Sequence, residues 1–373
     1  MRRVVFVLPS LNGGGAERAV INLAQAATRS QCVVIAESLT GDLAADDLAA
    51  EVVFVSNRPS LSRRPKRISQ LRRVLSRLQP DVVVSTLSPV VGTTAANLVR
   101  APVIHWLQAP WMRTTAAGQT GVVAAGHRFV LRTMISRSQL IAGATPGLLE
   151  ECQALGVPSD KLALLPNGFI LPPFEPSAKP NERPVVVMVA RLEPQKRPDL
   201  LLEAVELLSK QREVDLVFVG SGAWEDELRA RARALAMANR VKFTGFVPEP
   251  DRYIRAADVF ALATDHEGFG NVIVEALACG VPVVVSDVPY GPRFILGSTR
   301  MGHLVRPGSP AALAEGLRRA LDAPPSAADR AEGRRRAEEF AVERVAARFE
   351  SVVDRVLKEP TEARSTPPPT SWP

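Results

Sequence analysis

The chain contains little that would support a disulfide scaffold, a metal centre or a redox site. Its 373 residues include three cysteines and four histidines. Cys32, Cys152 and Cys279 stand far apart, so they form none of the short Cys-x-x-Cys pairs that bind zinc or exchange disulfides. We expect them to be buried thiols of a protein in a reducing compartment.

Long apolar runs are also absent. No stretch approaches the ~20 apolar residues that a helix needs to cross a bilayer. The basic start of the chain leads into the apolar residues 4–8, a run that is too short for a signal peptide and predicts a first β-strand. We therefore expect a cytoplasmic protein, which can still attach to the inner face of the plasma membrane.

Acidic residues are scarce in the first half of the chain. Residues 1–165 hold 18 Lys and Arg against 10 Asp and Glu, although the net charge of the whole chain is only +7. Between Arg58 and Arg77 eight basic residues meet no acidic one, and apolar residues recur there at helical spacing. This segment predicts a helix with one buried face and one basic face.

The basic face has two main interpretations. It can be a solvated surface, or it can contact an anionic membrane, where each basic residue adds about 1 kcal/mol of attraction. A third partner, nucleic acid, is not expected, because no motif that reads bases accompanies the charge.

The length and the pattern of the chain predict two α/β domains. A chain of 373 residues exceeds one usual core. In both halves, apolar β-branched runs alternate with amphipathic segments, which is typical of parallel sheets covered by helices. We expect a first domain at 1–166, a proline-rich linker at 167–184, a second domain at 185–341, a final helix at 342–358 and a disordered tail at 360–373.

The individual elements follow from the same alternation. In the first half we expect strands at 3–8, 32–36, 51–55, 81–85, 101–105, 139–142 and 161–165, and helices at 15–29, 65–79, 90–99, 122–137 and 146–155. In the second half we expect strands near residues 185, 215, 241, 258, 283 and 302, with helices between them and helical stretches from 310 to 358.

One segment places two carboxylates eight residues apart across a glycine-rich turn. Glu267 precedes Gly268-Phe269-Gly270, and Glu275 lies more than one turn into the apolar helix that follows. Apolar strands flank this turn and helix, which gives a strand, turn, helix, strand order. The unpaired N–H groups at such a helix start attract anions, and glycine lets a phosphate approach the backbone. The two carboxylates would then reach different parts of one ligand.

Several motifs in chain order resemble one enzyme family. The spacing of Glu267 and Glu275 resembles the Glu-x7-Glu signature of the retaining nucleotide-sugar glycosyltransferases of the GT4 family. Residues 189–198 resemble the segment that offers an arginine and a lysine to the donor diphosphate, and residues 286–292 resemble a turn after the next strand. The similarity runs from about residue 2 to residue 350. It implies the GT-B fold, in which two Rossmann-like, doubly wound parallel-sheet domains face a cleft.

The resemblance implies roles for four charged side chains. Arg191 and Lys196 would meet the negative charge that develops on the leaving nucleoside diphosphate. Glu267 would orient the transferred sugar, and Glu275 would hold the ribose hydroxyl groups. The β-phosphate would bind the backbone N–H groups of Phe269, Gly270 and Asn271. The Asn271 side chain could read a sugar hydroxyl or cap the turn.

Further motifs extend the expected site. The loop Gly13-Gly14-Gly15 joins the first strand to a helix, and it could be a plain helix start. By resemblance it touches the donor phosphate or the acceptor. Also by resemblance, Gly222 lines the nucleotide pocket, and Phe246 or Val247 packs on the base.

Two residues leave questions open. His105 ends an expected strand beside Trp106, where a lone histidine is more often a packed core residue than a catalyst. Family members often place a histidine at this strand end, near the donor sugar. Phe294 stands where many relatives have glutamate, which leaves the support of the neighbouring loop undecided.

The resemblance implies a hexosyltransferase-type, retaining glycosyltransferase with no cofactor beyond its co-substrate, a UDP- or GDP-linked sugar. The acceptor would be a lipid-linked saccharide of bacterial envelope or exopolysaccharide synthesis. No Asp-x-Asp metal motif is present, so we expect metal independence. Two alternatives are a nucleotide-sugar 2-epimerase of the same fold and a non-catalytic subunit that binds sugar nucleotides.

Overall fold

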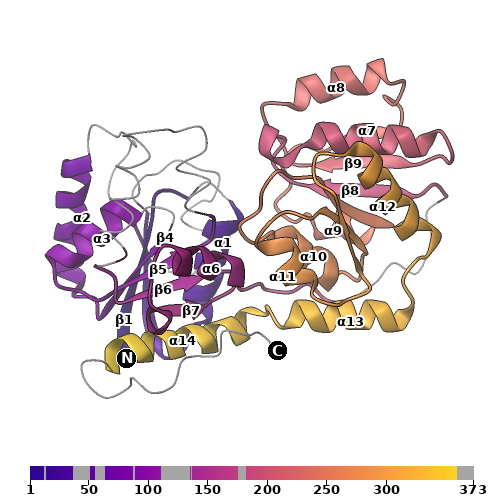
Figure 1. Cartoon of the computed structure of the whole chain (residues 1–373). Helices are drawn as coiled ribbons and strands as arrows, with labels where there is room; N and C mark the ends of the chain where they lie inside the picture. The colour runs from indigo at the N-terminus through magenta and orange to yellow at the C-terminus, as the bar shows by residue number, and fades with distance from the viewer. Residues whose placement is uncertain are drawn as a thin grey trace. The chain divides into compact units, whose positions relative to one another are not determined.

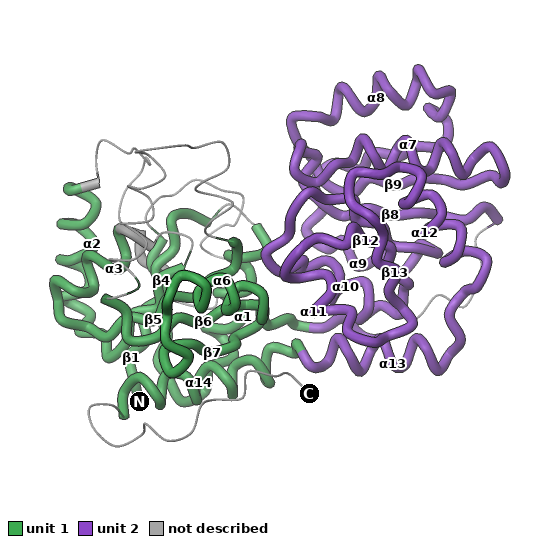
Figure 2. The backbone as a smooth tube through the Cα atoms, in the orientation of Figure 1, with its two compact units in different colours: residues 1–170, 340–373 green, residues 171–339 purple. Residues whose placement is uncertain are grey.

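A computed structural model describes residues 1–11, 14–36, 51–54, 64–86, 89–110, 135, 137–174 and 182–358. The chain divides into two compact units, which Figure 2 shows in different colours. Unit 1 comprises Met1–Ile170 and Phe340–Pro373, and unit 2 comprises Leu171–Glu339. The boundaries thus lie at 170 and 339 rather than at 166 and 341, and the expected linker, 167–184, is divided between the units.

Unit 1 is built on a parallel sheet in the order β3-β2-β1-β4-β5-β6-β7. Its described strands are β1 (Arg2–Leu8), β2 (Ser30–Ala36), β3 (Glu51–Phe54), β4 (Val82–Thr86), β5 (Val103–Leu107), β6 (Leu140–Gly143) and β7 (Leu162–Leu164). All neighbouring strands run in parallel, and the order reverses between β1 and β4. The carboxyl ends therefore meet at one edge, where doubly wound folds bind ligands.

Helices cover both faces of this sheet (Figure 1). They are α1 (Gly15–Ala26), α2 (Arg64–Leu78), α3 (Pro89–Leu98), α6 (Pro146–Ala154) and α14 (Val342–Lys358), with a 3-10 turn, η3 (Ser159–Lys161). Side chains of β1 alternate between the faces. Val4 and Phe6 pack in a cluster with α1 and α14, whereas Val5 and Val7 pack with α2 and α3.

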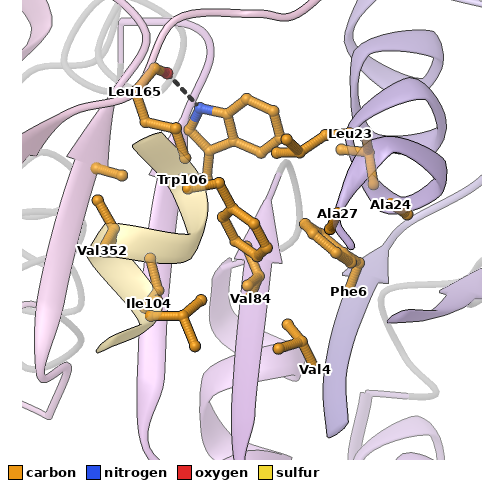
Figure 3. Close-up of a cluster of buried hydrophobic side chains, with 14 of the residues drawn as sticks. Val4, Phe6, Leu23, Ala24, Ala27, Val84, Ile104, Trp106, Leu165 and Val352 are labelled. Carbon is orange, nitrogen blue, oxygen red and sulfur yellow. Dashed lines mark hydrogen bonds between the residues drawn. The ribbon is translucent and has the colours of Figure 1, made fainter. Parts of the chain in front are cut away.

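Figure 3 shows the cluster under α1 and α14. The indole of Trp106 fills its centre and donates its Nε1–H to the carbonyl of Leu165 at 2.8 Å. From α14, the ring of Phe349 lies 5.4 Å from that of Phe6. The last described helix of the chain is therefore part of the core of unit 1.

Unit 2 repeats the plan with the strand order β10-β9-β8-β11-β12-β13, again all parallel. Its described strands are β8 (Val185–Val189), β9 (Asp215–Val219), β10 (Val241–Phe243), β11 (Val259–Leu262), β12 (Val283–Ser286) and β13 (Gly302–Val305). Its helices are η4 (Pro194–Lys196), α7 (Pro198–Ser209), α8 (Glu225–Ala234), α9 (Asp251–Arg255), α10 (Asn271–Ala278), α11 (Gly291–Leu296), α12 (Pro310–Asp322) and α13 (Ala327–Glu338).

The expected pair of parallel-sheet α/β domains is confirmed. Most elements begin and end close to their expected residues, but the strand expected at 101–105 is shifted, because β5 runs from Val103 to Leu107. The helix expected at 122–137 lies almost entirely outside the described residues, as do the tail at 360–373 and the basic residues Arg58 and Arg63.

The cysteines have the buried character that we expected. Cys152 and Cys279 are buried, Cys32 is half-buried, and all three are free thiols. Burial raises the pKa of each thiol to about 12. At neutral pH they are therefore protonated and unreactive.

Candidate active site

The carboxylate and the lysine that the sequence singles out meet in unit 2. Nζ of Lys196 lies 2.5 Å from Oε1 of Glu267. Glu267 is 6% exposed, and a carboxylate at that depth needs a charged partner. The two residues are 71 positions apart, but they follow β8 and β11, which are neighbours in the sheet. Parallel pairing of these two strands therefore brings the two motifs together.

Backbone and side-chain hydrogen bonds join the same two loops. The carbonyl of Gln195 accepts the N–H of Asp265 at 3.0 Å and the hydroxyl of Thr264 at 3.1 Å. The Gln195 amide donates to the carbonyl of His266 at 3.0 Å. Ser286, from the end of β12, accepts the N–H of Thr264 at 3.2 Å. These bonds fix the two loops that carry Lys196 and Glu267.

Arg191 follows β8 and is open to solvent. Its side chain is 66% exposed and lies 2.8 Å from the carboxylate of Glu193. An exposed pair of this kind contributes little to stability, because water and salt screen it. A diphosphate could therefore take the place of Glu193 as the partner of the guanidinium at small cost.

The turn after Glu267 leads into α10 through a left-handed glycine. Gly270 is the N-cap of α10 and has φ +96°, which side chains other than glycine rarely adopt. An added Cβ there would lie 2.9 Å from Cδ1 of Ile273. No side chain caps the helix at its N-cap position. The first N–H groups of α10 are thus presented at the carboxyl edge of the sheet, and Asn271 is the first helical residue.

Glu275 lies one turn further along α10. Asn271 and Glu275 are four residues apart and share one side of the helix, and both are half-buried. Val274 and Leu277 point to the core. The polar side of α10 therefore presents an amide and a carboxylate.

The remaining expected residues of unit 2 follow the next strands along the sheet. The loop after β9 contains Gly222 and is hydrogen-bonded to Leu192, which accepts the N–H of Trp224 at 3.0 Å. Phe246 follows β10 and is 55% exposed, and Val247 beside it is half-buried. The expected donor residues of unit 2 thus follow β10, β9, β8 and β11, which are consecutive in the sheet.

Phe294 replaces an expected carboxylate with a packing contact. Its ring meets that of Phe269 edge-on, with centroids 6.3 Å apart. On its other side the guanidinium of Arg336 lies 5.8 Å from the ring and donates to the carbonyl of Ile295 at 2.8 Å. Gly291, at the start of α11, packs directly on the carbonyl of Phe269. The loop that Phe269 belongs to is therefore supported by rings and backbone.

Arginines of α13 bind the carboxyl-terminal end of α10, which the sequence reasoning missed. Arg330 donates to the carbonyl of Gly280 at 2.5 Å, and Arg334 donates to that of Ala278 at 3.2 Å and to that of Pro172 at 2.6 Å. The last carbonyls of a helix lack partners within it, so cations stabilise them. The only signal in the sequence is a run of arginines at helical spacing.

In unit 1, the structure places two residues of the glycine loop at the start of α1. Gly14 is the N-cap of α1 and Gly15 its first residue, at the carboxyl end of β1, whereas Gly13 lies outside the described residues. Gly14 has no side chain to cap α1, and the carboxylate of Glu17 lies against it. Glu17, in the first turn, is buried.

The prediction that His105 ends a strand is wrong. It lies in the middle of β5, is 1% exposed, and its Nε2 is 2.8 Å from the hydroxyl of Thr93. The register pairs it with Ser85 inside the sheet, and burial lowers its pKa to about 4. His105 is thus buried and neutral at pH 7, and its expected place near the donor sugar stays a prediction.

Two family models match the chain. The model described as "Glycosyltransferase Family 4" matches residues 13–171, and the model described as "Glycosyl transferases group 1" matches residues 173–337. The first match falls within unit 1 and the second within unit 2, apart from one residue at the boundary. The two matches follow each other along the chain.

Curated bacterial enzymes are among the similar proteins. The N-acetylgalactosamine-N,N'-diacetylbacillosaminyl-diphospho-undecaprenol 4-alpha-N-acetylgalactosaminyltransferase of Campylobacter jejuni is 29% identical over 200 residues, 52% of this chain and 54% of that protein. The GDP-mannose-dependent alpha-(1-6)-phosphatidylinositol monomannoside mannosyltransferase of Mycolicibacterium smegmatis is 33% identical over 203 residues, 52% of each. The chain spans about half the length of these relatives.

Solved structures share the fold. HepE of Anabaena, in complex with UDP and glucose, has a TM-score of 0.79 at 21% identity, covering 95% of this chain and 100% of that one. The lipopolysaccharide outer core galactosyltransferase WaaB, in its apo form, has a TM-score of 0.73 at 19% identity, with 94% and 99% covered. At these identities the likeness concerns the fold. The chain belongs to the GT4-type glycosyltransferases and has their GT-B fold.

Proposed function

We propose that this protein is a retaining hexosyltransferase that uses a UDP- or GDP-linked sugar. The observation that carries the proposal is the ion pair of Lys196 and Glu267, because it sets a cation and a buried carboxylate side by side ahead of the start of α10. Arg191 follows the same strand as Lys196. HepE of Anabaena, which has the same fold, was solved with UDP and glucose, which supports a nucleotide-sugar donor here.

The charges suit a departing nucleoside diphosphate. As the bond to the sugar breaks, negative charge accumulates on the phosphate oxygens. Lys196 would meet it as a mobile point charge, and Arg191 as a planar fork for two oxygens. The N–H groups at the start of α10 would add the positive end of the helix dipole. Such preorganised donors are typically worth ~3 kcal/mol or more in the transition state.

The carboxylates would position the rest of the donor. Glu267 would hold Lys196 with one oxygen and accept a hydroxyl of the transferred sugar with the other. Glu275 would accept the two ribose hydroxyls, and the exposed ring of Phe246 would pack on the base. Attack on the face that the diphosphate leaves, with a phosphate oxygen as base, would retain the anomeric configuration.

We propose a lipid-linked saccharide of bacterial envelope or exopolysaccharide assembly as the acceptor. The names of two relatives support this class, since one acts on a saccharide linked to diphospho-undecaprenol and the other on a phosphatidylinositol mannoside. No described helix combines the length and the apolar character needed to cross a membrane. A surface on α2 could contact the membrane that carries such an acceptor.

The surface on α2 carries basic side chains and no acidic ones. Leu71 and Leu75 are buried against the sheet of unit 1, and the helix contains no acidic residue. Its exposed cations are Lys66, Arg72, Arg73 and Arg77.

We expect the double variant Arg72→Glu, Arg73→Glu to reduce sedimentation with anionic vesicles at low salt, while neutral vesicles give the same recovery for the variant and the wild type. The control is Arg233→Glu, Arg335→Glu, at two exposed positions of unit 2, which should sediment as the wild type does. Equal wild-type recovery with both vesicle types would remove the membrane proposal.

One assay separates transfer from the two alternatives. The purified chain is incubated with UDP-, GDP- and ADP-linked sugars in the presence of EDTA, with and without a lipid extract as acceptor source. Transfer or slow hydrolysis releases the nucleoside diphosphate, whereas an epimerase yields a sugar isomer without release. Neither product, with no rescue by the extract, would indicate a binding subunit. Release that depends on an added divalent cation would contradict metal independence.

A further inference from the structure

Strained backbone in the described structure lies beside both members of the Lys196–Glu267 pair. Five described residues other than glycine have a positive φ. Three of them follow helix ends, where a left-handed residue is an ordinary stop: Gln79, Arg100 and Ala236. The other two, Arg197 and Tyr290, precede helices. Arg197 directly follows Lys196, and the backbone of Tyr290 pairs with that of Glu267. Strain that is kept in this way is typical of functional sites.

The left-handed turn at Arg197 joins the loop of Lys196 to α7. Lys196 ends the short turn η4, Arg197 is the N-cap of α7 with φ +45° and ψ +48°, and Pro198 is the first helical residue. This conformation costs a residue with a side chain about 1–2 kcal/mol, whereas glycine adopts it freely. The side chain of Arg197 must therefore offset the cost or serve a function.

The guanidinium of Arg197 bonds to both oxygens of Asp199. Its Nε donates to Oδ1 at 3.1 Å and its Nη2 to Oδ2 at 3.0 Å, the two-bonded geometry that arginine forms with carboxylates. Asp199 lies in the first turn of α7 and is 7% exposed. A longer contact, 3.4 Å, joins Nη1 to Oδ1 of Asp265. Because Asp265 is half exposed, that contact contributes little, and the bond to Asp199 dominates.

The pair of Arg197 and Asp199 fixes the backbone next to Lys196. Asp199 belongs to α7, which packs against the sheet with Leu201 and Val205 fully buried. Arg197 is therefore attached to a helix that cannot shift freely. A cation that meets charge as it develops is effective only when its place is set before the reaction. Freedom lost at Arg197 is also lost by its neighbour Lys196.

We propose that Arg197 is a positioning residue, which holds Lys196 where a departing diphosphate requires the ammonium. It acts through its ion pair with Asp199 and does not touch the substrate. This inference rests on the proposed function, in which Lys196 meets the charge of the diphosphate.

Steady-state release of nucleoside diphosphate tests this role. The wild type is given UDP-glucose, UDP-galactose and GDP-mannose, and the variants are measured with the donor that reacts fastest. Arg197→Gln should lower kcat about tenfold and leave KM within about twofold, because a misplaced cation weakens the transition state. Arg197→Lys keeps the charge without the planar fork and should be intermediate. The matched control Arg255→Gln breaks a pair with Asp251 whose arginine is similarly exposed, 25% against 27%, and should keep the wild-type kcat.

A double variant separates positioning from stability. Arg197→Gln leaves Asp199 buried without its cation, so it should also lower the unfolding temperature. Adding Asp199→Asn removes the buried charge and should restore part of the stability. Turnover should stay low in the double variant, since Arg197 is still missing. Recovery of turnover together with stability would show a purely structural role and overturn the proposal.

A second background tests whether Arg197 acts through Lys196. In Lys196→Met, adding Arg197→Gln should change kcat by less than about twofold, because an absent ammonium cannot be misplaced. A further tenfold loss would show an independent role and overturn the inference. The proposed function fails if the wild type releases no diphosphate from any donor. The inference alone fails if the wild type does release it and Arg197→Gln keeps the same kcat.

Discussion

At the scale of the residue, the site depends on the ion pair between Lys196 and Glu267. The carboxylate is nearly buried, and its stability there comes from the ammonium 2.5 Å away. A ligand that binds Lys196 would still leave the ammonium of Lys196 within reach of the Glu267 carboxylate. Under the proposed function, the pair would offer a cation to a phosphate without leaving the buried carboxylate unpaired.

Replacing Lys196 should affect both activity and stability. We expect Lys196→Met to lower kcat by ~100-fold or more, which corresponds to about 3 kcal/mol in the transition state. It should also lower the free energy of unfolding, since Glu267 would lose its partner. Steady-state diphosphate release and urea unfolding measure the two effects. Lys210→Met, at an exposed pair with Glu206, is the control. Full activity in Lys196→Met would contradict the assigned role.

His105 should contribute to acid sensitivity rather than to catalysis. Its pKa is about 4 in the folded chain and near 6.5 when exposed, so the unfolded state binds more protons between these values. The free energy of unfolding should therefore fall as pH drops from about 6.5 to about 4, by up to about 3 kcal/mol from this residue.

The variant His105→Gln checks this assignment. It removes the titrating group and keeps a hydrogen-bonding atom for Thr93. Urea unfolding at pH 7, 5.5 and 4.5 should show a shallower pH dependence for the variant than for the wild type, with donor turnover retained. Loss of turnover in a variant that stays fully folded would instead support a catalytic histidine.

The residue scale also shows what the sequence could not reveal. Arg191, Lys196, Glu267 and Glu275 could be singled out as candidates because each lies in a short motif that follows a strand. The role of His105 was undecided because a shift of two residues in the strand boundary decides whether a side chain ends the strand or lies inside it. The left-handed turn at Arg197 has no sequence signal, since no glycine marks it.

At the scale of the element, α10 is the part that presents the site. Its start follows Gly270 at the N-cap, and its end is bound by arginines of α13 through the carbonyls of Ala278 and Gly280. The alternation of strands and helices was readable from apolar periodicity. The bracing of one helix by another was not, because it depends on the long reach of arginine side chains.

Removing one of these arginines should loosen α10. We expect Arg334→Ala to lower the free energy of unfolding by about 1–3 kcal/mol, because the partly buried carbonyls of Ala278 and Pro172 would lose a charged donor. Thermal or urea unfolding measures this change. Arg335→Ala, at an exposed neighbouring position, should be within about 0.5 kcal/mol of the wild type. Equal stability of both variants would contradict the bracing role.

At the scale of the whole molecule, α14 returns the chain to unit 1. Backbone bonds fix its start, since Phe169 donates to the carbonyl of Phe340 at 3.0 Å and Val342 donates to that of Phe169 at 2.9 Å. Glu350, which is buried, accepts the hydroxyl of Ser30 at 2.8 Å. The core of unit 1 is thus completed only by the end of the chain.

Removing the ring of Phe349 from α14 should destabilise unit 1. We expect Phe349→Ala to lower the stability of unit 1 by about 3–5 kcal/mol, because the ring is fully buried against Phe6. Hydrogen exchange should rise in β1 and α1 and stay unchanged in the sheet of unit 2. Ser351→Ala, at an exposed position, is the control. Equal loss of protection in both units would contradict their separate cores.

The most direct test of the central claim is a crystal structure of the chain with UDP or GDP bound. The account predicts phosphate oxygens within hydrogen-bond distance, about 3 Å, of Lys196 and Arg191 and of the first N–H groups of α10. Glu275 should hold the ribose. A nucleotide bound elsewhere, with its phosphates away from both cations, would contradict the account.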